Sequence, residues 1–186
     1  MKKIKFKSFL KGKIVDLVII DEEFINNTDW FSWINQKVNT EYLTQGNFPN
    51  TLSHQKKYFK EQIVSNKRLQ LGVVLKLNEE LIGVISLYSI NYYNRDAFVS
   101  TFFNKKKYKS SLKVFHETHS LIISHAFKKM NLRRIISTTI SKEMDDLVCR
   151  ILNFKREGVL KKKTFKDNKY HDMYISSKFK TNPRKC

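Results

Sequence analysis

Residues 97–130 decide the predicted fold, and they read AFVSTFF (97–103), NKKKYKSSLKVF (104–115) and HETHSLIISHAFKKM (116–130). The first segment is a short apolar run of strand type, and the second is polar and strongly basic. From the end of the second segment onward, apolar residues and one histidine recur at helical spacing: Leu112, Phe115, His119, Ile122, Ile123, Ala126 and Met130. The sequence therefore predicts a strand, a basic loop and a long helix, in this order.

The basic loop is a candidate anion site. A loop that opens a helix presents unpaired backbone N–H groups and the positive end of the helix dipole, and both favour phosphate. Several lysines surround this point: Lys105, Lys106, Lys107, Lys109 and Lys113. Two interpretations stay open here, a site for a phosphate-bearing ligand and a solvated basic loop between two core elements. The spacing alone favours the second.

The composition indicates one globular domain. A chain of 186 residues can bury a real core, and its 41% hydrophobic and 13% aromatic residues argue against disorder. No apolar run approaches the ~20 residues that span a membrane, and the basic start lacks an apolar segment of signal-peptide type. The two cysteines, Cys149 and Cys186, make neither a disulfide framework nor a metal-ligand cluster. We therefore expect a cytoplasmic protein without a metal site.

The net charge is +19, which attracts polyanions such as nucleic acid, an acidic membrane surface or phosphorylated small molecules. The lysines are spread over the whole chain, and a compositionally biased genome would produce the same pattern. The sequence shows no RNP-like aromatic motif, zinc-finger spacing or heptad basic region. We expect no specific nucleic-acid partner. The oligomeric state stays open, a homodimer included.

Hydrophobic periodicity predicts about seven strands and four helices in mixed order. The strands are expected at residues 14–20, 69–77, 81–90, 97–103, 134–140, 154–160 and 170–179. The helices are expected after a cap at Asp21, after a cap at Thr51 or Ser53, along the periodic segment up to Met130, and at 144–152. This order is typical of an α/β or α+β sheet domain covered by helices. We expect a single domain, with loosely ordered ends at 1–12 and 180–186.

The segment ILNFKREGVLKKKTFKDNKYHDMYISSKF, residues 151–179, resembles the C-terminal part of GNAT-superfamily N-acetyltransferases. It is similar to the branch of ribosomal-protein alanine acetyltransferases and aminosugar or nucleotide-sugar N-acetyltransferases, where GF-x-x-EG-x-L-R leads to F-x-D-G-x-Y-x-D. The matching positions are Phe154, Glu157, Gly158, Leu160, Phe165, Asp167, Tyr170 and Asp172. Further matches are Leu81-Ile82-Gly83, Ala126-Phe127 before Asn131-Leu132-Arg133-Arg134, and Trp30-x-x-Trp33-x-Asn35 with Leu43 and Pro49.

The resemblance implies the GNAT fold, a mixed twisted sheet of about seven strands with helices on both faces. It also implies acetyl-CoA as cosubstrate and a central strand, residues 99–103, that splays from its neighbour and hydrogen-bonds the pantetheine arm. The cofactor-binding residues expected on this basis are Val99, Thr101, Phe102, Phe103, Tyr108, Lys109, Ser110, Ser111, Leu112 and Lys113.

The loop before the long helix departs from the family pattern. The family places Q/R-x-x-G-x-G/A there, because glycine lets backbone N–H groups approach the pyrophosphate. In this chain the glycine positions fall at Ser111 and Lys113. Two accounts stay open: cofactor binding persists with altered chemistry, or the site has decayed and the fold serves binding only.

The residues expected to do chemistry depart as well. The tyrosine that often serves as general acid toward the CoA thiolate falls at Cys149, and the glutamate near the start of the central strand falls at Phe98. We therefore name Cys149 and His171 as catalytic candidates, since histidine has a suitable pKa range for a base. His119 lies in the apolar stripe and is expected to be a buried structural histidine.

The acceptor pocket is expected to be built from aromatic and amide side chains, which suit a sugar or a peptide N-terminus. The candidates are Trp33, Asn35, Tyr42, Gln45, Tyr88 and Tyr92, with Trp30 beside them. The leading hypothesis is N-acetylation of a primary amine, a small molecule such as a nucleotide-linked aminosugar. The alternatives are a catalytically silent GNAT-fold module that binds a polyanion through its lysines, and a protein N-terminal acetyltransferase.

Overall fold

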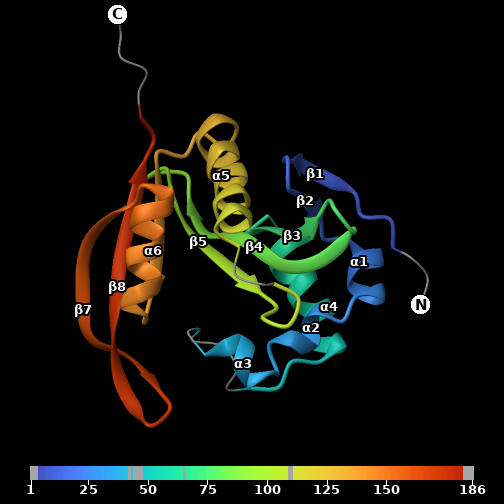
Figure 1. The fold of residues 1–186 in the computed structure, drawn as a ribbon, viewed down its shortest axis with the longest axis horizontal. Helices are drawn as coiled ribbons and strands as arrows, with labels where there is room; N and C mark the ends of the chain where they lie inside the picture. The colour runs from blue at the N-terminus through green and yellow to red at the C-terminus, as the bar shows by residue number, and fades with distance from the viewer. Residues whose placement is uncertain (1–3, 42, 44–47, 65, 109–110, 182–186) are drawn as a thin grey trace, which may run out of the picture.

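The computed structural model describes residues 4–41, 43, 48–64, 66–108 and 111–181. Over these residues the chain forms one eight-stranded sheet in the order β1-β2-β3-β4-β5-β6-β8-β7 (Figure 1). Its strands are β1 (Ser8–Lys11), β2 (Val15–Ile19), β3 (Leu69–Leu75), β4 (Glu80–Asn91), β5 (Asp96–Phe103), β6 (Arg134–Thr139), β7 (Lys155–Lys166) and β8 (Lys169–Phe179). All neighbours pair antiparallel except β5 and β6, which are parallel.

The helices of the described residues are α1 (Glu22–Asn27), α2 (Trp30–Trp33), α3 (Lys37–Thr40), α4 (Leu52–Tyr58), the π-helix η1 (Phe59–Val64), α5 (Leu112–Lys128) and α6 (Lys142–Leu152). The expected caps at Asp21 and Thr51 are confirmed, because each side chain accepts a hydrogen bond from the first turn of its helix. The helix that Asp21 caps is short. It ends at Thr28, whose hydroxyl donates to the Phe24 carbonyl, and two more short helices follow.

The first strand was missed by the sequence analysis. Residues 1–12 were expected to be a loosely ordered end, whereas Ser8–Lys11 form β1 and pair with β2. The strand is only four residues long and alternates between half-buried and exposed side chains, so its apolar signal is weak. It covers the edge that β2 would otherwise expose.

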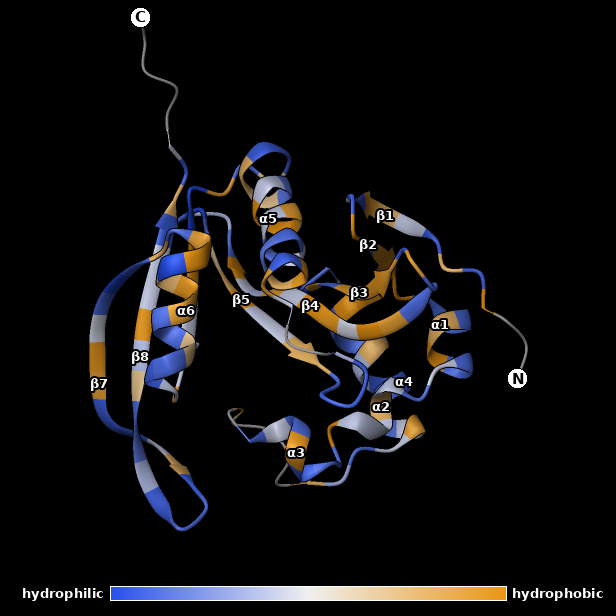
Figure 2. Cartoon of the chain, in the orientation of Figure 1, coloured by the Kyte–Doolittle hydropathy of each residue, from blue (hydrophilic) through white to orange (hydrophobic). Residues whose placement is uncertain are grey.

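Each face of the sheet buries its own apolar cluster, because successive strand residues point to opposite faces. One cluster lies under α5 and α6 and includes Leu17, Val73 and Ile85. The other lies under α1, α2 and α4 and includes Val18, Val84 and Phe24. Figure 2 shows hydrophobic residues along the central strands and on parts of the helices. The expected arrangement of helices on both faces is therefore confirmed.

Helix α5 packs across the centre of the sheet. Ser111 is its N-cap and accepts from the Val114 N–H at 3.4 Å, and the buried stripe starts at Val114 and Phe115 and ends at Ala126. The predicted helix is thus confirmed, with an end two residues before the expected Met130. Residues 104–108 follow β5, and α5 begins at Leu112.

Glu117 fastens α5 to the turn between β1 and β2. Its carboxylate accepts three backbone N–H groups, from Lys13 at 2.8 Å, Ile14 at 2.7 Å and Val15 at 2.8 Å. Burial raises the pKa of Glu117, but the three backbone donors outweigh that effect and hold the pKa below its usual value. A Cβ added at Gly12 would lie 2.8 Å from the Glu117 carboxyl carbon, so the turn needs glycine there.

We predict that Glu117→Ala lowers the free energy of unfolding by about 1–3 kcal/mol, because three backbone donors lose their acceptor. Glu117→Gln keeps one acceptor oxygen and should lose less. Urea unfolding of the three proteins at neutral pH measures the difference. Equal midpoints for the wild type and Glu117→Ala would show that water satisfies these donors as well as the carboxylate does.

Candidate active site

The parallel pairing of β5 and β6 stops early. It covers only Asp96–Arg134, Ala97–Ile135 and Phe98–Ile136. Beyond Phe98, β5 stays paired with β4, and β6 stays paired with β8 to its end at Thr139. The two strands therefore separate from Val99 onward, and no described strand lies beside this edge of β5. The expected splay of this strand is confirmed.

A cavity of about 590 Å³ fills the gap between the separated strands. We call it the cleft. Strand β5 lines it with residues 99–103, and β6 lines it with residues 137–139. Helix α5 adds Phe115 and His119, and α6 adds an apolar row that includes Val148. A partly apolar cavity beside an open strand edge suits an extended ligand that carries amide groups.

The expected cofactor-binding residues divide into three groups. Six line the cleft: Val99, Thr101, Phe102, Phe103, Tyr108 and Leu112. Ser111 caps α5, and Lys113 is exposed on the outer side of that helix. Lys109 and Ser110 lie outside the described residues.

The loop after β5 is held by packing as well as by charge. Tyr108 stacks on Phe103 with 4.2 Å between the ring centres, and its hydroxyl donates to the Ser111 carbonyl at 2.8 Å. Burial raises the pKa of Tyr108 to about 12. Lys105 forms an ion pair with Glu41 at 2.7 Å, and Lys107 lies 5.2 Å from the centre of the Trp33 ring. These two lysines therefore bind the segment of α2 and α3, which the anion-site interpretation did not foresee.

His119 and Thr101 form a polar pair in the wall of the cleft. The His119 Nδ1 lies 2.8 Å from the Phe115 carbonyl, which can only accept, so Nδ1 carries the proton. The Nε2 atom then accepts from the Thr101 hydroxyl at 2.7 Å. Burial lowers the pKa of His119 to about 4, so the ring is neutral at pH 7. The expectation of a buried structural histidine is confirmed, but its place in the cleft wall was missed.

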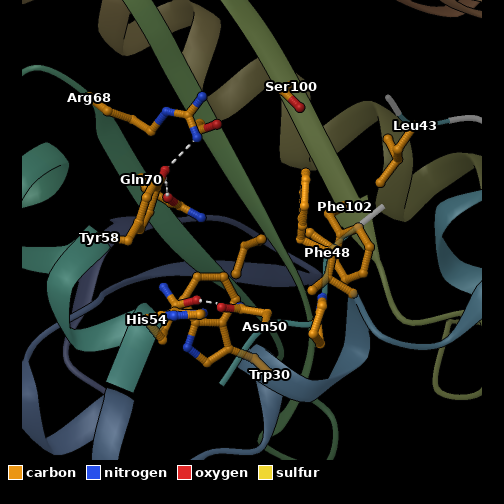
Figure 3. A pocket seen from close by; sticks show the side chains of 15 residues that line it. Trp30, Leu43, Phe48, Asn50, His54, Tyr58, Arg68, Gln70, Ser100 and Phe102 are labelled. Carbon is orange, nitrogen blue, oxygen red and sulfur yellow. Dashed lines mark hydrogen bonds between the residues drawn. The ribbon is translucent and has the colours of Figure 1, made fainter. Parts of the chain in front are cut away.

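A second cavity, of about 710 Å³, lies on the opposite face of β5 under α2 and α4 (Figure 3). We call it the acceptor cavity. Its described lining is Trp30, Ile34, Leu43, Phe48, Pro49, Asn50, His54, Gln55, Tyr58, Arg68, Gln70, Val84, Ser86, Ser100 and Phe102. Ser100, Phe102 and Leu43 line the cleft too. The two cavities therefore meet along β5.

Arg68 places a positive charge in the described lining of the acceptor cavity. Its guanidinium lies 5.7 Å from the centre of the Tyr58 ring and 4.8 Å from that of Tyr88. It donates to the Tyr58 hydroxyl, which donates in turn to the Gln70 side-chain oxygen at 2.8 Å (Figure 3). Burial raises the pKa of Tyr58 and Arg68 offsets only part of that, so the phenol stays neutral.

Two buried donors of the acceptor cavity have no partner among the described residues. They are the Nε2 of Gln55, a residue that is 4% exposed, and the indole N–H of Trp30, which is 7% exposed. The lining of both cavities, as far as the described residues show it, contains no Asp or Glu. The two buried lining atoms without a partner among the described residues are therefore both donors.

A family model described as an acetyltransferase (GNAT) domain matches residues 24–143 of the chain. The chain belongs to the GNAT acetyltransferase family. It is therefore an acetyltransferase by family, and this assignment supports the enzyme hypothesis over the silent binding module. No curated protein matched the sequence of this acetyltransferase.

Solved acetyltransferases share its fold. RimL, a ribosomal L7/L12 alpha-N-protein acetyltransferase in complex with coenzyme A, is 15% identical, with a TM-score of 0.79 over 90% of this chain and 95% of that one. MccE, a microcin C7 self-immunity acetyltransferase in complex with acetyl-CoA and AMP, is 17% identical, with a TM-score of 0.75 over 90% and 93%. A Vibrio cholerae spermidine N-acetyltransferase in complex with CoA and spermine is 15% identical, with a TM-score of 0.74 over 89% and 95%.

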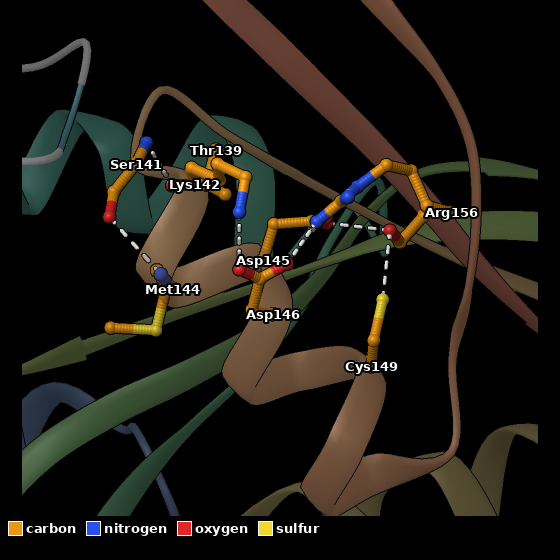
Figure 4. Close-up of polar contacts among 9 residues, drawn as sticks. Thr139, Ser141, Lys142, Met144, Asp145, Asp146, Cys149 and Arg156 are labelled. Atoms are coloured by element: carbon orange, nitrogen blue, oxygen red, sulfur yellow. Dashed lines mark hydrogen bonds and ion pairs between the residues drawn. The ribbon is translucent and has the colours of Figure 1, made fainter.

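The acetyltransferase does not bring Cys149 to either cavity. Its sulfur lies 3.4 Å from the Ser176 hydroxyl, which donates to the buried Asp145 carboxylate at 2.6 Å. Arg156 pairs with the same carboxylate (Figure 4). Residues 144, 147, 148 and 152 of α6 face the cleft. Cys149 is one position, about 100°, beyond Val148 and faces β8 instead. This catalytic prediction is not supported by the geometry.

His171 also lies outside both described cavity linings. It sits on β8 near the turn to β7, and its Nε2 donates to the Lys166 carbonyl at 3.2 Å. Lys166 itself donates to the carbonyl oxygens of Thr40 and Leu43, the latter at 2.6 Å, so the tip of this hairpin is fastened to α3. The histidine belongs to that junction and does not contact the site.

The acceptor residues expected from the sequence are mostly structural. Trp33 is fully buried and stacks on Phe102, and Asn35 exchanges two hydrogen bonds with the backbone of Asn50. Tyr88 lines the cleft and carries Arg68 on its ring. Tyr92 is exposed and lines neither cavity. Tyr42 and Gln45 lie outside the described residues.

Sequence reasoning missed most of the acceptor cavity. The cavity brings together side chains of β3, β5, α4 and the residue directly before β3: Gln70, Ser100, Gln55, Tyr58 and Arg68. One local signal was present, because Gln70 is a lone polar residue inside the apolar strand LQLGVVL and is buried there. A buried polar side chain in a strand needs a partner, and Gln70 has one in Tyr58.

We predict a stability loss in acid that depends on His119. The pKa of His119 is about 4 in the folded protein and 6.5 in the unfolded chain. Between these pH values the unfolded chain therefore binds a proton that the folded protein does not bind. This stabilisation is complete above pH 6.5 and is lost as pH falls toward 4, by about 3 kcal/mol. Denaturant unfolding between these pH values should show a flatter profile for His119→Gln. Parallel profiles for the two proteins would contradict the prediction.

We predict that Cys149→Ala keeps the acetyl-transfer rate within the same order of magnitude. Removal of a general acid usually costs roughly 10²- to 10⁴-fold. Release of the CoA thiol, followed with a thiol reagent at saturating acetyl-CoA, measures the rate. A rate loss in that range, in a variant that keeps the wild-type unfolding midpoint, would show that Cys149 takes part in the reaction.

Proposed function

We propose that this acetyltransferase transfers the acetyl group of acetyl-CoA to a primary amine of a small molecule, such as a nucleotide-linked aminosugar. The observation that carries the proposal is the meeting of the cleft and the acceptor cavity along Ser100 and Phe102. A thioester held in the cleft and an amine held in the acceptor cavity would then approach each other across β5. The binding of CoA by the solved relatives supports the same use of the cleft.

The chain's own part in the reaction is mainly to position the two substrates. The open edge of β5 offers backbone N–H and C=O groups to the amides of the pantetheine arm. The amine nitrogen attacks the thioester carbonyl carbon, the C–S bond breaks, and the sulfur takes up the proton that the nitrogen loses. Holding the reacting atoms at contact distance supplies much of the rate in such direct transfers.

The acceptor cavity would help to keep the amine neutral. Its described lining has no carboxylate that would stabilise an ammonium group, and it contains the positive charge of Arg68. A like charge nearby lowers the pKa of an amine, and burial does the same. The amine would therefore lose its proton to solvent as it enters, and a dedicated carboxylate base is not required.

The aromatic lining supports a small acceptor that includes a planar group. Trp30, Tyr58 and Phe102 offer ring faces on which a base or a sugar can pack. The solved relatives differ in this respect: MccE was captured with AMP, and the Vibrio cholerae enzyme with spermine. A protein N-terminus is the second candidate, and the fold shared with RimL is the observation that favours it.

The test of the proposal is binding of acetyl-CoA to the wild type and to Ser137→Phe, which places a ring in the cleft. The wild type should bind, and at 100 times the dissociation constant it should gain about 2.7 kcal/mol of apparent stability. Ser137→Phe should lose this binding while keeping its unfolding midpoint. Calorimetric titration measures both proteins.

ADP is the control for charge, because it carries the phosphates without the pantetheine arm. A chain with a net charge of +19 attracts any polyphosphate at low salt. The proposal fails if the wild type shows no binding at millimolar acetyl-CoA, or if ADP and acetyl-CoA bind equally and Ser137→Phe changes neither.

A further inference from the structure

The amide of Gln55 is oriented by its neighbours so that its nitrogen stays free. The Asn50 Nδ2 donates to the Phe31 carbonyl at 3.1 Å and to the Gln55 Oε1 at 3.0 Å. Because a carbonyl can only accept, the Phe31 oxygen fixes which end of the Asn50 amide faces Gln55. The Gln55 oxygen must then face Asn50, and its buried Nε2 is left without an acceptor among the described residues.

Aromatic rings hold Arg68 in place, and no counter-ion for it lies among the described residues. The rings of Tyr58 and Tyr88 flank its guanidinium, and one of its N–H groups is donated to the Tyr58 hydroxyl. The described residues provide no carboxylate ion pair for it. A guanidinium has five N–H donors in a planar fork that matches a carboxylate or a phosphate, so most of this fork is available. Figure 3 shows it at the wall of the acceptor cavity with Tyr58 and Gln70.

We propose that the acceptor carries an anionic group, a carboxylate or a phosphate, and that Arg68 selects for that group. The inference rests on the proposed function and narrows its substrate class. The buried nitrogens of Gln55 and Trp30 lack an acceptor among the described residues, and they reach oxygen atoms of the acceptor when these side chains turn toward the cavity. A polyamine brings additional positive charges and no oxygen atoms, so this cavity disfavours it.

Matched acceptor pairs test the inference in two arms. Tyrosine and tyramine differ only in a carboxylate, and glucosamine 6-phosphate and glucosamine differ only in a phosphate. Spermidine serves as the cationic acceptor. For each compound we would measure binding by calorimetry in the presence of CoA, and kcat/KM with acetyl-CoA by release of the thiol. The arm with the larger preference identifies the anionic group.

In at least one arm the anionic member should bind or react roughly 10- to 100-fold better, the range for a charged hydrogen-bond pair. Arg68→Gln should remove that preference and leave acetyl-CoA binding unchanged. Arg68→Lys, which keeps the charge but not the fork, should retain part of it. Arg133→Gln is the matched control, because it removes the same charge from a residue that lines neither cavity.

Three results would overturn the inference. They are equal or better use of the uncharged member in both arms, a preference for spermidine, and a preference that survives Arg68→Gln. Absence of binding by both anionic compounds at millimolar concentration also counts against it. Failure of the proposed function looks different, because acetyl-CoA itself would then fail to bind the wild type.

Discussion

The site depends on one constraint, the end of parallel pairing between β5 and β6 after Phe98 and Ile136. Each strand has a firm partner on its other side, since β4 pairs with β5 to Phe103 and β8 pairs with β6 to Thr139. Each strand therefore keeps its backbone hydrogen bonds on its other side when the two strands separate, so the two halves of the sheet can diverge. Apolar side chains of α5 and α6 fill the base of the gap and keep it open. The cleft, the exposed edge of β5 and the contact with the acceptor cavity all follow from that divergence.

The elements around the cleft could be predicted from sequence, because their signals are local. The apolar run before Phe103 and the helical stripe from Val114 to Ala126 each fix one element, and the structure has both. The acceptor cavity could not be predicted in the same way. Arg68 directly precedes β3 and Ser100 lies on β5, 32 residues further along the chain, so only the packing of β3, β4 and β5 makes them neighbours.

The prediction for Cys149 failed for a local reason, because a shift of one residue along a helix turns a side chain away from the site.

The lysine-rich composition has structural uses that the net charge conceals. Lys105 pairs with Glu41, and Lys166 binds the carbonyl oxygens of Thr40 and Leu43. These contacts bring the loop after β5 and the β7–β8 hairpin against the same short segment around α3. These two lysines therefore help to fix the segment that contains Leu43, which lines both cavities. The expectation of no specific nucleic-acid partner stays a prediction, and these contacts give part of the charge another role.

The wall shared by the two cavities has a consequence for the order of events. The described lining holds no cysteine thiol that could carry an acetyl group from one cavity to the other, and His119 is hydrogen-bonded at both ring nitrogens. The proposed transfer then runs directly from the thioester to the amine across β5. Both substrates must occupy the protein at the same moment, so initial-rate plots are expected to intersect, as they do when a ternary complex forms before any product leaves.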